Sequence, residues 1–125
     1  MTDDDGWGAS ALEGSRWELV ATDEGPLGIE RAPTLGFDPE GEVSGLAGCN
    51  RYRGQAILGD GTISIGPLVL TRMLCPPVLA ALETAVCAAL EGASSWTRHD
   101  DELELSGEGG VMRLLFRRAA EGVDA

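Results

Sequence analysis

The chain has 125 residues, 43% of them hydrophobic, and its 9 basic and 21 acidic side chains give a formal net charge of −12 at pH 7. Such a length and apolar share are typical of one globular domain that needs neither a metal nor several disulfides to fold. The negative charge disfavours nucleic acids and anionic membranes as partners, because the field of the molecule repels polyanions. No stretch approaches the roughly 18 apolar residues of a membrane span.

The two ends of the chain differ from its middle. Residues 1–6 are acidic where a secretory signal would be basic, and no apolar segment follows them, so we expect a cytoplasmic protein. Residues 1–11 and 119–125 are mostly acidic, polar or small, and we expect them to be mobile tails. Between them, residues 12–118 should form a single domain, which we expect to be monomeric.

Alternation of apolar and polar residues recurs in short runs separated by Gly, Pro or Asp. This is the pattern of an antiparallel sheet with one solvated face. Tight-turn residues at Asp38–Gly41 and Leu58–Gly61 predict two hairpins, and the last three strands should form a meander. The predicted strands are residues 17–21, 34–37, 43–46, 52–58, 62–65, 68–70, 95–98, 102–105 and 111–116.

After Pro76 the apolar period changes from two residues to that of an α-helix. Pro77 suits a first helical turn, and Gly92 stands where helices commonly end, so the sequence predicts a helix over residues 77–91. The apolar positions that carry this period are Leu79, Leu82, Val86 and Leu90. The fold class is therefore mostly β (α+β), with one helix.

Two segments carry a family resemblance: Gly48–Gly54, with the sequence GCNRYRG, and Thr71–Cys75, with the sequence TRMLC. With the strand at Trp17 before them and the helix bearing Glu83 and Leu90 after them, they resemble the paired signature of the META domain, which includes the heat-inducible HslJ-like proteins. The resemblance spans nearly the whole chain. It implies a single-domain, antiparallel, partly open β-barrel with one α-helix packed against it. The signature residues are Gly48, Cys49, Asn50, Tyr52, Gly54, Thr71, Met73 and Cys75.

The resemblance implies little biochemistry, because the family has no established reaction. Its association with stress and with bacterial envelopes implies a non-enzymatic binding or accessory module whose partner is a protein or a hydrophobic ligand. Many relatives are exported or lipidated, so an envelope location stays open if a leader was removed. The alternatives are a lipid-binding barrel and a structural unit without a ligand. A lipid cavity would be lined by Tyr52, Leu70, Met73, Leu82 and Phe116, which could equally be plain core.

The resemblance also places Cys49 and Cys75 in two elements that should abut, with their sulfurs close enough for a disulfide. A bridge would stabilise the fold by about 3–4 kcal/mol in the chain-entropy account, whereas in a reducing cytosol the pair would be two small buried groups. Asn50 is expected to form a tight corner between two strands, and Tyr52 to point into the barrel. Gly48 and Gly54 suit a bulge or a close backbone approach.

Other chemistries have less support in the sequence. A cysteine nucleophile needs a base, and His99 is the only histidine, beside two aspartates in a predicted turn. A zinc site of Cys49, Cys75, Cys87 and His99 has suitable ligand types but lacks the short paired spacing of preformed sites. Cys87 also flanks the apolar helix stripe and should be an inert thiol. We therefore expect no catalytic residues, metal or cofactor.

Three arginines stand close to the signature in a chain with few basic residues: Arg51, Arg53 and Arg72. If the two segments abut, their guanidinium groups would form a cationic rim able to bind a carboxylate or a phosphate. Charge neutralisation by neighbouring acids is the simpler account. Neighbouring acids that could do so include Glu30, Glu40 and Glu42.

Overall fold

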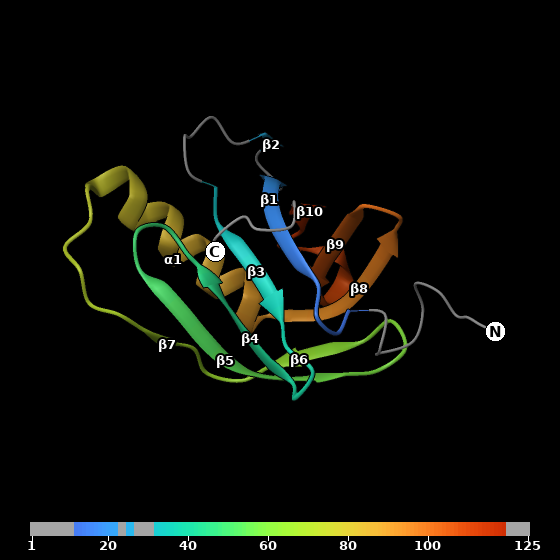
Figure 1. Ribbon diagram of the computed structural model, residues 1–125. Coiled ribbons are helices and arrows are strands. Elements are labelled where there is room, and N and C mark those ends of the chain that lie inside the picture. The colour runs from blue at the N-terminus through green and yellow to red at the C-terminus, as the bar shows by residue number, and fades with distance from the viewer. Residues whose placement is uncertain (1–11, 23–24, 27–31, 120–125) are drawn as a thin grey trace.

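A computed structural model describes residues 12–22, 25–26 and 32–119 of the chain (Figure 1). The predicted tails lie outside these residues, apart from Ala119, whose N–H donates to the Arg16 carbonyl at 2.8 Å. The elements are β1 (Arg16–Thr22), β2 (Gly25–Pro26), β3 (Thr34–Phe37), β4 (Glu42–Leu46), β5 (Arg51–Leu58), β6 (Ile63–Ile65), β7 (Val69–Leu70), α1 (Pro77–Glu91), β8 (Ala93–His99), β9 (Glu102–Gly107), a 3₁₀ turn (Glu108–Gly110) and β10 (Leu114–Arg118).

The strands form an antiparallel sheet in the order β6-β5-β4-β3-β1-β10-β9-β8, with β2 beside β1 and β7 beside β5. The two ends of this order approach each other. Thr62 and Ser95 form an isolated bridge, and the Trp96 N–H donates to the Gly61 carbonyl at 3.1 Å. The sheet is therefore a nearly closed barrel, which confirms the predicted architecture.

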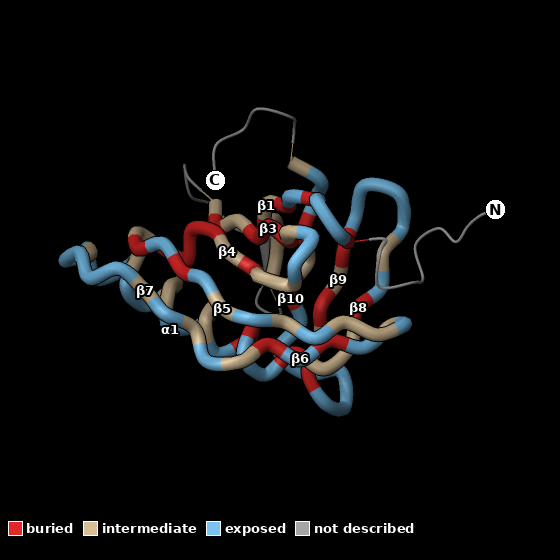
Figure 2. The backbone as a smooth tube through the Cα atoms, turned by 60° about the horizontal axis from the view of Figure 1, so that its bottom comes forward, coloured by how far each residue is buried: buried red, intermediate tan, exposed pale blue. Residues whose placement is uncertain are grey.

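Large apolar side chains fill the barrel interior. Trp17, Trp96 and Phe116 are each at most 1% exposed. The indole N–H of Trp17 donates to the Ser15 hydroxyl at 2.7 Å, and that of Trp96 to the Gly59 carbonyl at 3.1 Å, so neither ring buries an unpaired donor. The core, drawn in red along the inner strands in Figure 2, is thus held mainly by apolar burial.

Helix α1 spans the predicted residues and packs against β6 and β9. Only the second half of its apolar stripe is deeply buried, at Val86 and Leu90, together with Ala89. Leu79 and Leu82, in the first half, are half-buried. The start of α1 therefore projects beyond the barrel, next to the signature segments (Figure 1). Within the described part of the chain, no helix combines the length and apolar character of a membrane span.

The predicted hairpins and the closing meander are present. In the first hairpin, Asp38 caps the turn by accepting the N–H groups of Glu40 and Glu42 at 2.9 Å, and Gly41 supplies the positive φ of 95°. The last strand begins later than predicted, at Leu114. Met112 has a φ of 54°, which ends the extended run before β10 and turns residues 111–113 into part of the connection.

Candidate functional site

The two signature segments lie side by side, as the resemblance implies. We call Gly66–Pro76, which joins β6 to α1 and contains β7, the strap. Its Thr71 N–H donates to the Arg51 carbonyl at 3.0 Å, and the Thr71 hydroxyl accepts the Arg51 N–H at 3.1 Å. Leu70 pairs with Tyr52 across β7 and β5. The strap therefore runs beside the first part of β5, where β7 adds a short strand to the sheet (Figure 1).

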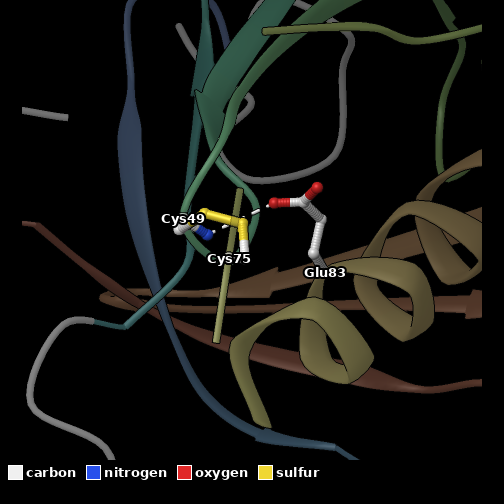
Figure 3. A group of neighbouring side chains, drawn as sticks. All are labelled: Cys49, Cys75 and Glu83. Carbon is white, nitrogen blue, oxygen red and sulfur yellow. Dashed lines mark hydrogen bonds between the residues drawn. A yellow bond between two sulfur atoms is a disulfide. The ribbon is translucent and has the colours of Figure 1, made fainter. Parts of the chain in front are cut away.

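Cys49 and Cys75 are joined by a disulfide, with their Cα atoms 6.0 Å apart (Figure 3). The bond ties the corner that precedes β5 to the end of the strap, at the entrance of α1. Cys87 is the free, half-buried cysteine. Burial, with further contributions from the charges of Glu83 and Glu91, raises the pKa of its thiol to about 11. It is therefore a neutral thiol at pH 7, in line with the predicted inert role.

Asn50 joins both halves of the signature through its side chain, although it is only 5% exposed. Its Oδ1 accepts the Met73 N–H at 2.6 Å and the Thr71 hydroxyl at 2.9 Å. Its Nδ2 donates to the Met73 carbonyl at 3.3 Å and to Glu83 Oε2 at 3.0 Å. We call Asn50, Thr71 and Glu83 the polar clamp, because together they fix the corner, the strap and α1.

The backbone at Asn50 forms the predicted tight corner, since the Ala47 N–H donates to the Asn50 carbonyl at 2.8 Å. The corner is made without a positive φ at Asn50, because the positive φ values of described residues other than glycine are at Asp100 and Met112. The Asn50 side chain bonds the strap, where Met73 supplies both an N–H donor and a carbonyl acceptor.

Glu83 was recognised in the sequence only as a residue of the helix, and its part in the site was missed. Its Oε1 accepts the N–H groups of Cys49 at 3.2 Å and Asn50 at 2.9 Å. Desolvation raises the pKa of this carboxyl, but hydrogen bonds from Asn50, Cys49 and Gly48 outweigh it, and the net pKa lies below the ordinary value. Glu83 is therefore a carboxylate at neutral pH, committed to holding the corner (Figure 3).

Gly48 allows the corner to approach the helix this closely. A Cβ at this position would lie 2.8 Å from the Cβ of Glu83 and still closer to the Leu79 carbonyl. Gly54 has a similar role, since a Cβ there would lie 2.8 Å from a methyl of Leu68. Both glycines serve close packing, as expected.

The strap presents apolar side chains to solvent. It borders a groove of about 740 Å³ that is also lined by Asn50 and Glu83. Met73 is 62% exposed and Leu74 is 99% exposed. Figure 2 shows the exposed run at the end of the molecule that carries β7. Four of the seven large hydrophobic residues exposed in the described chain lie between residues 69 and 78, namely Val69, Met73, Leu74 and Val78.

The three arginines near the signature gather around the same strap. Arg72 lines the large groove, and Arg51 and Arg53 line an adjoining depression of about 420 Å³. The two hollows share residues 69–71. Among the described residues, Arg53 and Arg72 form no salt bridge, whereas Arg113 pairs with Glu104 at 2.7 Å. Glu30 lies outside the described residues. We call these three arginines and the four exposed apolar residues the strap surface.

The candidate cavity residues differ in how far they are buried. Tyr52 and Phe116 belong to the buried core, and the Tyr52 hydroxyl donates to the Thr34 carbonyl at 2.7 Å. Burial, with a smaller effect of Cys87, raises the pKa of Tyr52, so this hydroxyl remains a donor. The other three differ from one another: Leu70 and Leu82 are partly buried against the core, whereas Met73 lies on the outer surface.

The zinc set weighed from the sequence is not assembled. Within the described part of the chain, one group of side chains could hold a metal ion, namely Cys49, Cys75 and Glu83. Their ligand atoms lie within 4.8 Å of one another. Cys87 and His99 are not in it. His99 is exposed at the end of β8, opposite Glu102.

Comparison with known proteins adds the family and the fold. The META domain matches residues 10–121 of this chain. A protein from Burkholderia xenovorans whose structure was solved by NMR is 28% identical, with 97% of this chain and 94% of that one covered and a TM-score of 0.74. A second NMR structure is 27% identical over 85% of this chain and 90% of that one, with a TM-score of 0.68.

A more distant structure shares the fold alone. It is a DUF4847 family protein from Bacteroides vulgatus, 14% identical, with 88% of this chain and 96% of that one covered and a TM-score of 0.67. No curated protein matches the chain.

Proposed function

Because this chain belongs to the META domain family, we propose that it is a non-enzymatic binding module whose barrel supports the strap surface, and that the strap surface contacts a partner protein. The observation that carries the proposal is the solvent exposure of Met73 and Leu74 on a segment fixed at both sides. Asn50 holds the Met73 backbone, and Cys75 is bonded to the corner. Such rigid presentation reduces the entropy that binding would otherwise cost.

The charges of the strap surface favour an acidic partner. The chain carries 9 basic residues against 21 acidic ones, and Arg51, Arg53 and Arg72 all lie beside the exposed apolar side chains. Arginine and methionine are enriched at protein interfaces, and a local positive patch on an acidic molecule steers complementary ligands. The occupant is therefore a segment with apolar side chains flanked by Asp or Glu.

The chemistry of the polar clamp supports a binding role over catalysis. A general base must accept a proton from a substrate, but the Glu83 carboxylate already accepts hydrogen bonds from Cys49 and Asn50, and these lower its pKa. Both polar atoms of the Asn50 side chain also have partners within the fold. The clamp thus acts as a fastening for the strap.

The disulfide supports an oxidising compartment and, with it, the envelope-related role that the family resemblance implies. We propose this location in place of the cytoplasmic one expected from the sequence. Trapping the thiols of the protein with an alkylating reagent in intact host cells tests it. One free thiol per chain is the expected result, and three free thiols would place the protein in a reducing compartment.

The binding proposal is tested by NMR on the full chain labelled with ¹⁵N. The probe is a synthetic peptide in which Leu and Phe alternate with Glu, and its charge-reversed counterpart with Lys is the control. We expect the acidic peptide to shift the amide signals of residues 51–53 and 69–78, and the basic one to leave them unchanged. A fatty acid is the second probe, since a lipid-binding barrel would respond at core residues such as Trp17 and Phe116.

Two variants make the test specific. Leu74→Ser should abolish the shifts, whereas Ile57→Ser, which changes a residue that is 76% exposed outside the strap surface, should preserve them. Equal binding of the acidic and basic peptides, or equal binding by the two variants, would contradict the proposal. Shifts confined to the core on addition of the fatty acid would favour the lipid-binding alternative.

A further inference from the structure

The disulfide lies beside a carboxylate that other groups hold in place. The sulfur atoms of Cys49 and Cys75 and a carboxylate oxygen of Glu83 lie within 4.8 Å of one another (Figure 3). They come from the corner before β5, from the end of the strap and from α1. We propose that, once the disulfide is reduced, these three side chains bind a zinc ion, with water as the fourth ligand.

The backbone around the two cysteines is fixed by contacts other than the disulfide. The Cys49 N–H donates to Glu83, and Asn50 holds Met73, two residues before Cys75. Reduction therefore frees the two sulfurs without releasing the segments that carry them. In a tetrahedral zinc site with Zn–S bonds of about 2.3 Å, the two sulfurs stand roughly 3.8 Å apart. Side-chain rotation can reach this spacing from Cα atoms 6.0 Å apart.

The three ligands are of the types that zinc prefers, two thiolates and one carboxylate. Asn50 supplies the outer partner that such sites use, because its Nδ2 donates to Cys75 Sγ at 3.4 Å and to Glu83 Oε2 at 3.0 Å. The same Nδ2 also bonds the Met73 carbonyl at 3.3 Å. Asn50 Nδ2 therefore still has the Met73 carbonyl as a partner when Glu83 Oε2 turns to the metal.

The fourth position is assigned to water, because Cys49, Cys75 and Glu83 are each only half-buried and Glu83 also lines the large groove. Three ligands with one open position distinguish this site from closed structural sites with four protein ligands. Cys87 lies one helical turn after Glu83 but outside the group of three, so it is a spectator.

A dithiol can act as the reductant that opens the disulfide between Cys49 and Cys75. The dithiol gives two electrons and two protons to the bond between Cys49 and Cys75 and becomes a cyclic disulfide, leaving two protein thiols. One Zn²⁺ then displaces the two protons and forms two zinc–thiolate bonds. In the reverse direction, oxidised glutathione and two protons regenerate the protein disulfide, two molecules of glutathione and free Zn²⁺. Zinc would thus hold the strap to α1 when the covalent bond is absent.

Titration of the full chain with Co²⁺ and then Zn²⁺ tests the site, after reduction with a phosphine and removal of metal with a chelator. We expect one Co²⁺ per chain, with the near-ultraviolet band of thiolate-to-cobalt charge transfer, and its loss when Zn²⁺ is added. The oxidised protein should give no such band. A reduced protein without the band, or equal zinc affinity in both redox states, would overturn the proposal.

Two matched variants test the carboxylate ligand. Glu83→Gln should weaken zinc binding by more than the roughly 10–100-fold that loss of an outer partner costs. Glu91→Gln changes another carboxylate of α1, one that accepts the Leu68 N–H at 2.9 Å, and should leave zinc affinity unchanged. Cys87→Ser should retain the cobalt band. Equal zinc affinity in the two glutamate variants would exclude Glu83 as a ligand and overturn the site.

A measurement on the wild-type chain avoids any dependence on how the variants fold. X-ray absorption of the reduced, zinc-loaded protein should show two sulfur and two oxygen ligands, and native mass spectrometry should show one chain per ion. Four sulfur ligands, or one ion shared by two chains, would contradict the proposal.

Discussion

The barrel side and the signature side of this molecule are held together by different forces. On the barrel side, β1, β8, β9 and β10 enclose Trp17, Trp96 and Phe116, and exclude water almost completely. On the signature side, the strap packs Leu68 and Leu70 partly against the core, and its second half is fastened by the polar clamp and one disulfide. Apolar burial is non-directional, whereas hydrogen bonds and a disulfide fix positions. The barrel therefore supplies stability, and the signature supplies a defined surface.

The largest expected effect is a loss of stability from a substitution on the barrel side. Trp96→Ala removes a ring that is 1% exposed and its hydrogen bond to the Gly59 carbonyl, so it should lower the free energy of unfolding by about 3–5 kcal/mol. Urea denaturation followed by circular dichroism measures this. Ile57→Ala, at an exposed position, should cost less than about 0.5 kcal/mol. Similar costs for both variants would show that the apolar core does not dominate stability.

The next largest effect concerns the covalent part of the signature side. Replacing Cys49 and Cys75 together by Ala should lower the free energy of unfolding by about 3 kcal/mol, because the open chain regains the entropy of a loop that the disulfide closes across 26 positions. Denaturation of the variant and the oxidised wild type, both with a chelator present, gives this difference. Unchanged stability would mean that the hydrogen bonds alone hold the strap.

A smaller, pH-dependent effect concerns the clamp. Glu83→Gln should lower the free energy of unfolding by about 1–2 kcal/mol at pH 7, because hydrogen bonds to a carboxylate exceed those to a neutral amide. The folded-state pKa of Glu83 lies below its ordinary value of 4.5, so its contribution is fully present above about that pH and is lost as the pH falls through the folded pKa. Denaturation series from pH 7 to acid should show the two proteins converging.

Glu91→Gln is the control for this series, since the Glu91 carboxylate lies on the same helix outside the clamp. At pH 7 it should cost less stability than Glu83→Gln, since Glu91 accepts the Leu68 N–H whereas Glu83 accepts hydrogen bonds from the Cys49 N–H, the Asn50 N–H and Asn50 Nδ2. A cost of Glu83→Gln that does not shrink as the pH falls would contradict the assigned role of its charge.

The smallest expected effect is on stability at the strap surface. Leu74 is 99% exposed, so Leu74→Ser should change the free energy of unfolding by less than about 0.5 kcal/mol. Thermal and urea denaturation measure this. A larger loss would show that Leu74 packs within the fold and is not presented to a partner.

The fold could be predicted from the sequence where a local pattern carries the information. Period-two alternation and turn residues gave β3 and its hairpin correctly, and Pro77 and Gly92 bounded α1. Residues 111–113 were predicted as strand because their side chains alternate, but the positive φ of Met112 has no signal in that pattern. Strand β2 has only two residues, too few for any period.

The site could be predicted in part. The abutting segments and the disulfide came from the family resemblance, since sequence spacing alone does not bring Cys49 to Cys75. Glu83 was missed, although one signal could have found it. It stands four residues after Leu79 and three before Val86, so a charged residue occupies the apolar face of the helix. An acid at such a position needs donors, and only the tertiary fold shows that the corner supplies them.

Native-state hydrogen exchange of the oxidised protein tests most directly whether the two sides are held separately. In wild type, the Met73 amide, which donates to Asn50 at 2.6 Å, should be protected. In Asn50→Ala it should exchange through a local opening, while the amides of Leu103 and Leu105 in the barrel still exchange only on global unfolding. If all three amides exchange through the same opening in the variant, the signature and the barrel form one cooperative unit and the account is wrong.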